Sequence, residues 1–256
     1  MVIKMRIFCL FMNSSRIRLL MVVLLTVCCV GACKQAGLRD DADLDTSIRR
    51  LSQLLEEFYK IPVYTQNFGD RSFIAWKDQG KLTSFYETYR NDFSIMNNVF
   101  SMNAKTTGIW SDDAAFSRGV LYCLLTQVAP NPLTQEGALA VWNEFLHLGS
   151  AIHIEESTKT AMGDAFINKL EILTPSLSYE ENLQVIFRAY RTLSLIRLKE
   201  YQKAIKENEL IMQTYPTSKY AQEIAQDQIR AIRDVMEGKM SPPERLPERW
   251  QGHSVK

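Results

Sequence analysis

The chain has 256 residues, of which 46% are hydrophobic and 23% are charged, and a formal net charge of +1. This composition is typical of a globular protein, with room for one large helical domain or two small ones, and it excludes an intrinsically disordered chain. The first 32 residues hold four basic side chains and no acid, so the remainder has 26 basic and 29 acidic residues and a net charge of −3. Because nucleic-acid binding needs clustered basic side chains to neutralise phosphates, we exclude nucleic acid as a partner.

The N-terminal segment has the layout of a secretory signal. Residues 19–32 form a 14-residue apolar run that follows Arg16 and Arg18. This run is shorter than the roughly 20 apolar residues of a spanning helix and fits the roughly 7 to 15 of a signal core. We therefore predict a signal peptide over residues 1–32 and a polar tether over residues 33–42. A start at Met12 instead of Met1 would give a conventional signal length.

The stretch Val30-Gly31-Ala32-Cys33 resembles the bacterial lipobox. The resemblance implies a diacylglycerol on the Cys33 thiol, cleavage between Ala32 and Cys33, and a fatty acid such as palmitate on the new amino group. Two or three such chains anchor a protein stably to a membrane. Lys34 stands where many Gram-negative bacteria have Asp as the inner-membrane retention signal, which favours the periplasmic face of the outer membrane. The alternative is an ordinary signal peptide or an uncleaved anchor, with Cys33 incidental.

The cysteines do not form a disulfide framework within the mature chain. Four of the five, Cys9, Cys28, Cys29 and Cys33, lie in or at the edge of the N-terminal segment. Cys28 and Cys29 are poorer lipidation candidates because larger residues precede them. Cys123 is flanked by leucines and a tyrosine, so we expect a buried, inert thiol.

Apolar residues recur at helical spacing along the mature chain. The first expected helix carries Ile48, Leu51, Leu54, Leu55 and Phe58, and the second carries Leu82, Phe85, Tyr86, Tyr89, Phe93, Met96 and Phe100. Between them, residues 61–81 contain Pro62, Gly69 and Gly80, and they are expected to form an ordered connection with brief strand character over residues 72–76.

Further helices are expected over residues 111–128, 134–149, 157–173, 178–198, 200–215 and 218–236. Ser111, Thr134 and Ser178 are the expected N-caps, and Ser178 with Glu181 has the Ser-x-x-Glu form of a capping box. The predicted fold class is therefore all-α, with a helical domain over residues 43–237. Residues 238–256 are rich in proline and are expected to be an extended tail, in which Trp250 could contact a partner or pack back on the domain.

Residues 186–236 resemble the tetratricopeptide repeat (TPR), a helical hairpin that stacks into solenoids. Tyr201, Ala204, Ile205 and Pro216 fall where that repeat has its aromatic, its small alanine, an aliphatic residue and its terminal proline. The resemblance implies that Ala204 lies where two helices cross, that Tyr201 fills the space beside the turn and that Pro216 ends the second helix. The stretch from Tyr215 onward is similar to TPR lipoproteins of bacterial envelopes, including the lipoprotein of the β-barrel assembly machinery.

A weaker unit covers residues 113–148. Phe116, Gly119 and Tyr122 have the first-helix spacing, and Ala138, Leu139, Trp142 and Leu146 have the second-helix spacing. Gly119 is expected to permit close helix contact, and the other residues are expected to pack. The later unit departs from the pattern at Arg191, Thr192 and Asn208, so the number of true repeats stays open. The expected fold is a set of TPR-like antiparallel hairpins of the α-solenoid type.

No residue pattern indicates catalysis or a cofactor. Glu144 and His147 have the Glu-x-x-His form of di-iron bundles, but the second copy that such sites need is missing. The pairs Asp112-Asp113, Glu155-Glu156 and Glu180-Glu181 stand at expected helix starts or surfaces, where capping explains them. We therefore predict no enzyme activity, no metal and no cofactor.

The leading hypothesis is a membrane-anchored lipoprotein that binds another envelope protein through a helical-repeat scaffold, in outer-membrane assembly or maintenance. The alternative is a transport accessory or ligand-binding lipoprotein, in which the aromatic residues between Phe58 and Phe100 line a pocket. An envelope enzyme is the third hypothesis, and two carboxylates converging in a cleft with Glu144 or His147 would favour it.

Overall fold

A computed structural model describes residues 43–68, 72–105, 110–170 and 172–239 of the chain. Backbone contacts divide the chain into two units, Met1–Asp43 and Leu44–Lys256, and the description below concerns the second. The expected signal peptide over residues 1–32, the cleavage site at Ala32 and Cys33, the rest of the tether to residue 42 and the tail from residue 240 lie outside the described residues.

Helices form most of the described structure, which confirms the predicted helical fold. Residues 43–60 form the first of the described helices, called here the 43–60 helix. The helices that follow are α3 (Gln79–Asn103), α4 (Trp110–Val128), α5 (Pro132–Leu148), α6 (Glu156–Ala165), α7 (Tyr179–Arg197), α8 (Tyr201–Thr214) and α9 (Gln226–Met236). Short helical turns lie at Gly149–Ala151, at Ile167–Lys169 and, as a π-helical turn before α9, at Ala221–Ala225.

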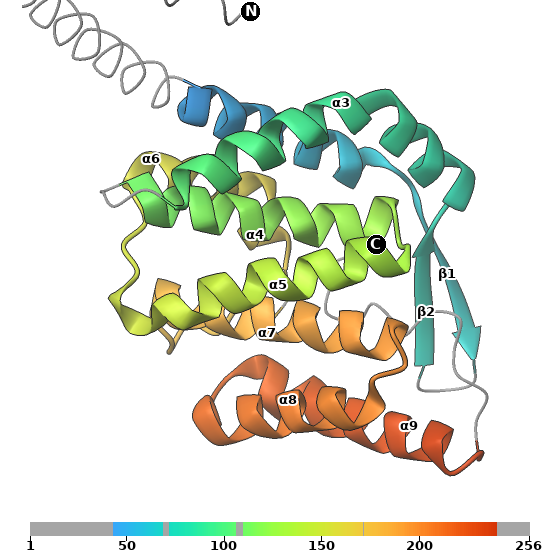
Figure 1. The fold of residues 1–256 in the computed structure, drawn as a ribbon. Coiled ribbons are helices and arrows are strands. Elements are labelled where there is room, and N and C mark those ends of the chain that lie inside the picture. Colours follow the sequence, from blue (N-terminus) through green and yellow to red (C-terminus); the bar gives the residue numbers. More distant parts are fainter. Residues whose placement is uncertain (1–42, 69–71, 106–109, 171, 240–256) are drawn as a thin grey trace, which may run out of the picture. The chain divides into compact units, whose positions relative to one another are not determined.

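Successive helices pack as antiparallel neighbours in one row (Figure 1). In this row α3 contacts α4, α4 contacts α5, α5 contacts α7, α7 contacts α8, and α8 contacts α9. The 43–60 helix lies beside α3, where Arg50 pairs with Asp92 at 2.8 Å. It also meets α6, because the Ser52 hydroxyl donates to the Ala161 carbonyl at 2.9 Å. The row is thus continuous in sequence except for α6, which packs on the first helix.

The connection after the 43–60 helix is a β-hairpin. Strands β1 (Val63–Phe68) and β2 (Ser72–Lys77) pair antiparallel, with Val63 opposite Lys77 and Phe68 opposite Ser72. The strand character predicted for residues 72–76 is confirmed, whereas the sequence does not predict β1, because Gln66 and Asn67 are weak strand formers. The buried Lys77 ammonium donates to the Ile61 carbonyl at 2.7 Å and lies 4.8 Å from the centre of the Phe58 ring, which ties the hairpin to the first helix.

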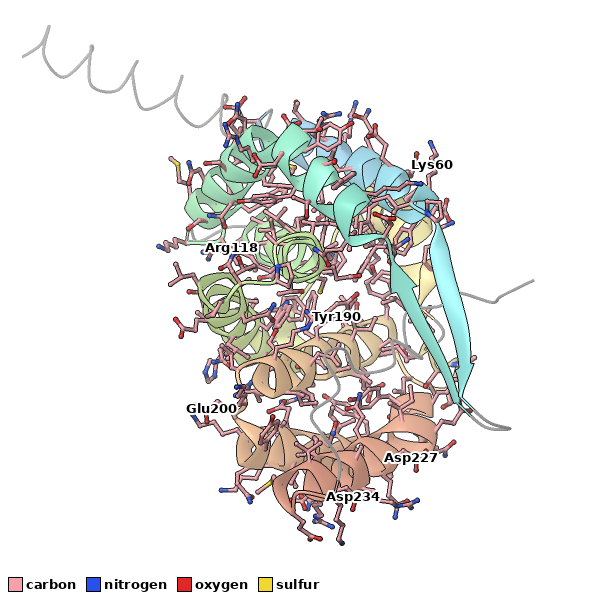
Figure 2. The ribbon with its side chains drawn as sticks, turned by 90° about the vertical axis from the view of Figure 1, so that its right-hand side faces the viewer. Lys60, Arg118, Tyr190, Glu200, Asp227 and Asp234 are labelled. Atoms are coloured by element: carbon pink, nitrogen blue, oxygen red, sulfur yellow. The ribbon has the colours of Figure 1, made fainter. Side chains whose placement is uncertain are left out.

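Aromatic side chains from neighbouring helices fill the core. Phe145 meets Phe187 edge to face with ring centroids 4.6 Å apart, and Phe116 lies 6.3 Å from Phe187. The Trp142 and Tyr190 rings are 5.8 Å apart, and Figure 2 shows Tyr190 between the helices. Such pairs contribute about 0.5–1.5 kcal/mol each beyond the burial of their area. Cys123 is a buried free thiol, as predicted.

Two predicted N-caps are wrong. The cap of α5 is Asn131, whose side chain accepts the Thr134 N–H at 2.9 Å. Asparagine is a better N-cap than threonine, and Pro132 suits the first helical turn because its missing N–H needs no partner there. Helix α4 begins at Trp110, so Ser111 lies inside its first turn instead of capping it.

Helix α6 ends at Ala165, whereas the apolar pattern predicts a helix to residue 173. Phe166 leaves the helical conformation with φ −135° and ψ −63°. The next residues form a single 3-10 turn, and this break buries Phe166, Ile167 and Leu170 together.

Within the described residues, no helix combines the length and the apolar character that crossing a bilayer requires.

Candidate functional site

A groove lies beside the N-terminal half of α7, between the end of α5 and the end of α8. Its volume is about 530 Å³. We call it the α7 groove, and it is lined by Leu146, Gly149, Ile152, Ser178, Glu180, Glu181, Gln184, Arg188 and Tyr215. The lining combines apolar side chains, carboxylates, an amide, a guanidinium and a phenol.

Local hydrogen bonds fix the helix that forms the floor of the groove. The Glu181 N–H donates to Ser178 Oγ at 3.1 Å, and the Ser178 N–H donates to the Glu181 carboxylate at 2.8 Å. The predicted capping box is therefore confirmed. The Gln184 amide donates to the Gly149 carbonyl at 3.3 Å, which links α7 to the end of α5. These bonds hold the floor that α7 forms and the wall at the end of α5 in place.

A group of charges, in which two half-buried arginines surround a buried carboxylate, supports the other wall. Arg188 Nη1 donates to Glu207 Oε1 at 2.8 Å, and Arg191 Nη1 lies 3.6 Å from the second carboxylate oxygen of Glu207. Burial raises the pKa of Tyr215, and the nearby Arg188 charge lowers it in part. Tyr215 is therefore protonated at neutral pH and presents a hydroxyl to the groove.

The α7 groove has the chemistry of a binding site. Arg188 and Tyr215 supply donors, Glu180 supplies a carboxylate acceptor, and Leu146 adds apolar surface. The residues that line it include Ser178 but no histidine, cysteine or lysine.

The predicted packing residues of the earlier unit lie in the core. A Cβ on Gly119 of α4 would come within 2.7 Å of the Phe187 ring of α7, so the two helices approach closely here. The Trp142 indole N–H donates to the Gly119 carbonyl at 3.1 Å. Ala138 and Trp142 are fully buried, and Tyr122 is half-buried. Of the predicted packing residues of this unit, Leu146 lines the α7 groove, and Gly119, Tyr122, Ala138 and Trp142 do not.

The predicted residues of the later unit are spread over a second core cluster. Ala204 is fully buried and packs with Leu195 and Ile205 of this cluster, and Tyr201 covers it in a half-buried position. Pro216 stands in the turn that follows the end of α8 at Thr214. Ala204 and Tyr201 therefore pack in this cluster, whereas Pro216 is exposed in the turn, and the structure does not gather the predicted residues at one site.

A buried polar network joins α8 to the last helix. The Tyr220 hydroxyl lies 2.9 Å from Asn208 Oδ1 and 2.8 Å from Gln228 Oε1, and Asn208 Nδ2 donates to Gln228 Oε1 at 3.1 Å. All three side chains are buried. Asn208 stands where the repeat pattern has an aromatic residue, and the neighbouring Tyr220 places an aromatic ring in the same network.

The side chains considered above as metal ligands or catalytic acids do not come together at one site. Glu144 is exposed and pairs with Arg118 at 2.9 Å, and His147 is exposed as well; Figure 2 labels Arg118. In the part of the chain that the structure describes, no group of three or more His, Cys, Asp or Glu side chains could hold a metal ion.

Asp112 and Asp113 do more than begin α4. The Asp112 carboxylate accepts the His153 N–H at 2.9 Å, and the Asp113 carboxylate accepts the Glu155 N–H at 3.1 Å. The pair thus fixes the segment that leads into α6, which corrects the interpretation of both acids as local caps.

Sequence reasoning misses Gln184, Arg188 and Tyr215 as groove residues. Gln184 contacts Gly149, 35 positions away, and Arg188 contacts Glu207, 19 positions away. Tyr215 belongs to the groove because it is partly buried at the end of α8. The one available signal is that Tyr215 belongs to the repeat-like stretch after α8.

The described residues thus form antiparallel helices packed in a row, with an open groove beside α7. No protein-family model, curated protein or solved structure matches the chain.

Proposed function

We propose that this chain is a bacterial envelope lipoprotein, held to a membrane by lipid on Cys33, whose helices form a TPR-like scaffold that docks another envelope protein. The observation that carries the docking part is the α7 groove, which is open to solvent and offers both apolar and hydrogen-bonding side chains. Helical repeats bind partners through such surfaces along their stacked helices. The function is contact, without bond chemistry.

Two packing features support the TPR-like assignment. In stacked hairpins the first helix of one hairpin touches the first helix of the next, and α4 meets α7 in this way at Gly119 and Phe187. The turn between α7 and α8 is short, and Lys199 adopts a positive φ of 62° within it. Ala204 then lies buried one turn into α8, where its small side chain allows close contact.

The ligand-binding alternative has less support from the described side chains. Phe58 and Phe85 rings lie 6.2 Å apart, and Tyr86 stacks on Phe93 at 6.0 Å. These aromatic side chains pack on one another, so the space that a ligand would need between them is filled.

The anchor is tested by substitution of the lipidated residue. We expect Cys33→Ser to abolish incorporation of radiolabelled palmitate and to block processing of the precursor. Cys28→Ser and Cys29→Ser serve as matched controls that keep the label. Unchanged labelling of Cys33→Ser excludes Cys33 as the lipid site.

The docking site is tested by affinity purification of the full chain from detergent-solubilised envelopes. Leu146→Arg places a charge in the α7 groove, and Leu133→Arg makes the same change at the exposed start of the same helix. We expect a stoichiometric partner with the wild type and with Leu133→Arg, and its loss with Leu146→Arg. Equal recovery by both variants excludes the groove, and a bound small molecule in native mass spectrometry without a protein partner favours the ligand-binding alternative.

A further inference from the structure

A second groove lies between α8 and α9, at the end of the helical row. It runs between Gln202 and Glu209 of α8 and between Arg233 and Glu237 at the end of α9, and its volume is about 360 Å³. We call it the α8–α9 groove, and it shares no lining residue with the α7 groove. Helix α9 is the last helix of the described chain, so no later described helix covers this groove (Figure 1).

The α8–α9 groove combines apolar surface with one open charge. Ile205 lines it from a buried position, and Met236 keeps 44% of its surface exposed. Glu209 pairs with Arg233 at 3.5 Å across the two helices. Lys206 also lines the groove, and it forms no ion pair with another residue that the structure describes. A segment that fits here therefore brings an apolar side chain together with a carboxylate.

The chain leaves α9 at the rim of this groove through a fixed turn. Gly238 has a positive φ of 70°, its N–H donates to the Val235 carbonyl at 3.1 Å, and the Lys239 N–H donates to the Asp234 carbonyl at 2.9 Å. This pair of bonds is the Schellman motif, which ends a helix and turns the backbone. Lys239 Nζ also lies 2.5 Å from the carboxylate of Glu237, which lines the groove. Lys239, the last described residue, is thus held at the rim.

Residues 240–256 lie outside the described structure, and their sequence holds a short tandem repeat. Pro243-Glu244-Arg245-Leu246 is followed directly by Pro247-Glu248-Arg249-Trp250. Proline lacks a backbone donor and favours extended conformations in the residue before it, so the repeat suits an extended chain better than a helix. Each unit has a glutamate two residues before an apolar side chain, and alternate residues of an extended chain face the same side. The second unit therefore offers a carboxylate and a large aromatic ring on one side.

We propose that the second unit of this repeat docks in the α8–α9 groove of its own chain. The Trp250 ring covers Ile205 and Met236, and a methionine sulfur makes favourable contacts with aromatic rings. The Glu248 carboxylate pairs with the open charge of Lys206. This docking depends on neither the lipid anchor nor the α7 groove, so it goes beyond the proposed function.

The tail is long enough for this contact and short enough to favour it. Trp250 is 11 residues after Lys239, and an extended chain of that length spans at most about 36–40 Å. The groove extends about 10 Å along α8 from Gln202 to Glu209. A short tether gives an effective concentration of about millimolar, so a contact too weak to hold a separate peptide holds the tail of the same chain.

The test is photocrosslinking of the full chain, purified in detergent. Gln251→p-benzoylphenylalanine places a photoreactive ring next to Trp250 and leaves Trp250 intact. We expect a crosslink within one chain, mapped by tandem mass spectrometry to residues 202–209 or 233–237. Val255→p-benzoylphenylalanine is the control, and it gives less of this product because it lies beyond the repeat.

Variants in the Gln251→p-benzoylphenylalanine background test the apolar contact. Trp250→Ala and Met236→Glu should each lower the crosslink yield about tenfold, which corresponds to about 1.4 kcal/mol, whereas Trp250→Phe should keep most of it. Met102→Glu should leave the yield unchanged. It is the matched control because Met102 is also an exposed methionine in the last turn of its helix. Since both methionines are exposed, the circular-dichroism spectrum should not change in either variant.

An exchange of charges tests the pairing of Lys206 with Glu248. Lys206→Glu should lower the crosslink yield about two- to fivefold, because exposed ion pairs contribute little. Lys206→Glu combined with Glu248→Lys should restore the yield, whereas a merely structural defect at Lys206 would persist.

The same crosslinking can overturn the proposal. Crosslinks spread over helices other than α8 and α9, or equal yields with and without Trp250→Ala, exclude the docking of Trp250 in this groove. A product with the mass of two chains excludes docking within one chain. A product with a protein of different mass shows that the tail binds a partner instead.

Discussion

Replacement of Gly119 by alanine tests whether α4 and α7 are in contact at the distance described. The added methyl group would lie 2.7 Å from Phe187 Cζ and 3.1 Å from both neighbouring ring carbons. The Phe187 ring is fully buried and is held edge to face by Phe145 at 4.6 Å. The ring therefore cannot turn away without disturbing the core.

The magnitude follows from two opposing effects. Glycine to alanine inside a helix stabilises by about 1 kcal/mol. Overpacking a tight core costs about 1–3 kcal/mol, and the enclosed ring puts this site in the upper half of that range. We expect Gly119→Ala to lower the free energy of unfolding by about 1–2 kcal/mol, which corresponds to about 2–8 °C in Tm. Gly163→Ala, whose methyl group would lie 3.8 Å from the nearest atom, Asn168 Nδ2, should instead gain about 0.5–1 kcal/mol.

Urea unfolding, monitored by circular dichroism, measures the change in the free energy of unfolding for both variants, provided that they share one m-value. Phe187→Leu is the second variant of the test, because its smaller side chain makes room for the methyl group at position 119. The double variant Gly119→Ala, Phe187→Leu should lose less than the sum of the single losses. Stabilisation by Gly119→Ala similar to that of Gly163→Ala refutes the close contact and, with it, one support of the TPR-like assignment.

Three further predictions use the same unfolding assay. Tyr220→Phe removes one buried hydrogen-bond donor, which can serve Asn208 Oδ1 or Gln228 Oε1, so it should cost about 0.5–1.5 kcal/mol, and no loss contradicts the network. Asn131→Ala removes the cap of α5 and should cost about 1 kcal/mol, more than Thr134→Ala; the reverse order restores Thr134 as the cap. Burial raises the pKa of Asp113 above its ordinary 3.8, so the folded state binds more protons and wild-type stability falls as the pH rises through this window. The stability of Asp113→Asn relative to wild type should therefore increase from acid to neutral pH, and a difference that is independent of pH contradicts the shift.

The helices could be predicted where an amphipathic pattern and a terminal signal agree. Ile48 to Phe58 and Leu82 to Phe100 repeat at helical spacing, and both sets are buried on one face in the structure apart from the half-buried Tyr86 and Tyr89. Ser178 was predictable because its capping partner lies three residues away. The end of α6 was not, because Phe166 continues the apolar spacing while its backbone leaves the helix to fill the core.

The groove could not be predicted because its contacts cross between helices. Gln184 meets Gly149 at a separation of 35 residues, and Arg188 meets Glu207 at 19. Each contact depends on the register with which α7 packs on its neighbours, and the periodicity of one helix does not specify that register. The chemistry of single residues also gave little guidance, since an arginine on an amphipathic helix is usually solvated.

The bond between Ser52 and Ala161 has a consequence for the order in which the chain folds. It joins segments 109 residues apart, whereas α3 packs on α4 and α4 packs on α5, each the next helix in the sequence. Short loops close at lower entropic cost, so adjacent helices can assemble as they are synthesised, while the 43–60 helix must wait for α6. We therefore expect the 43–60 helix, the first of the described helices to be synthesised, to be the last of them to acquire its full protection from hydrogen exchange.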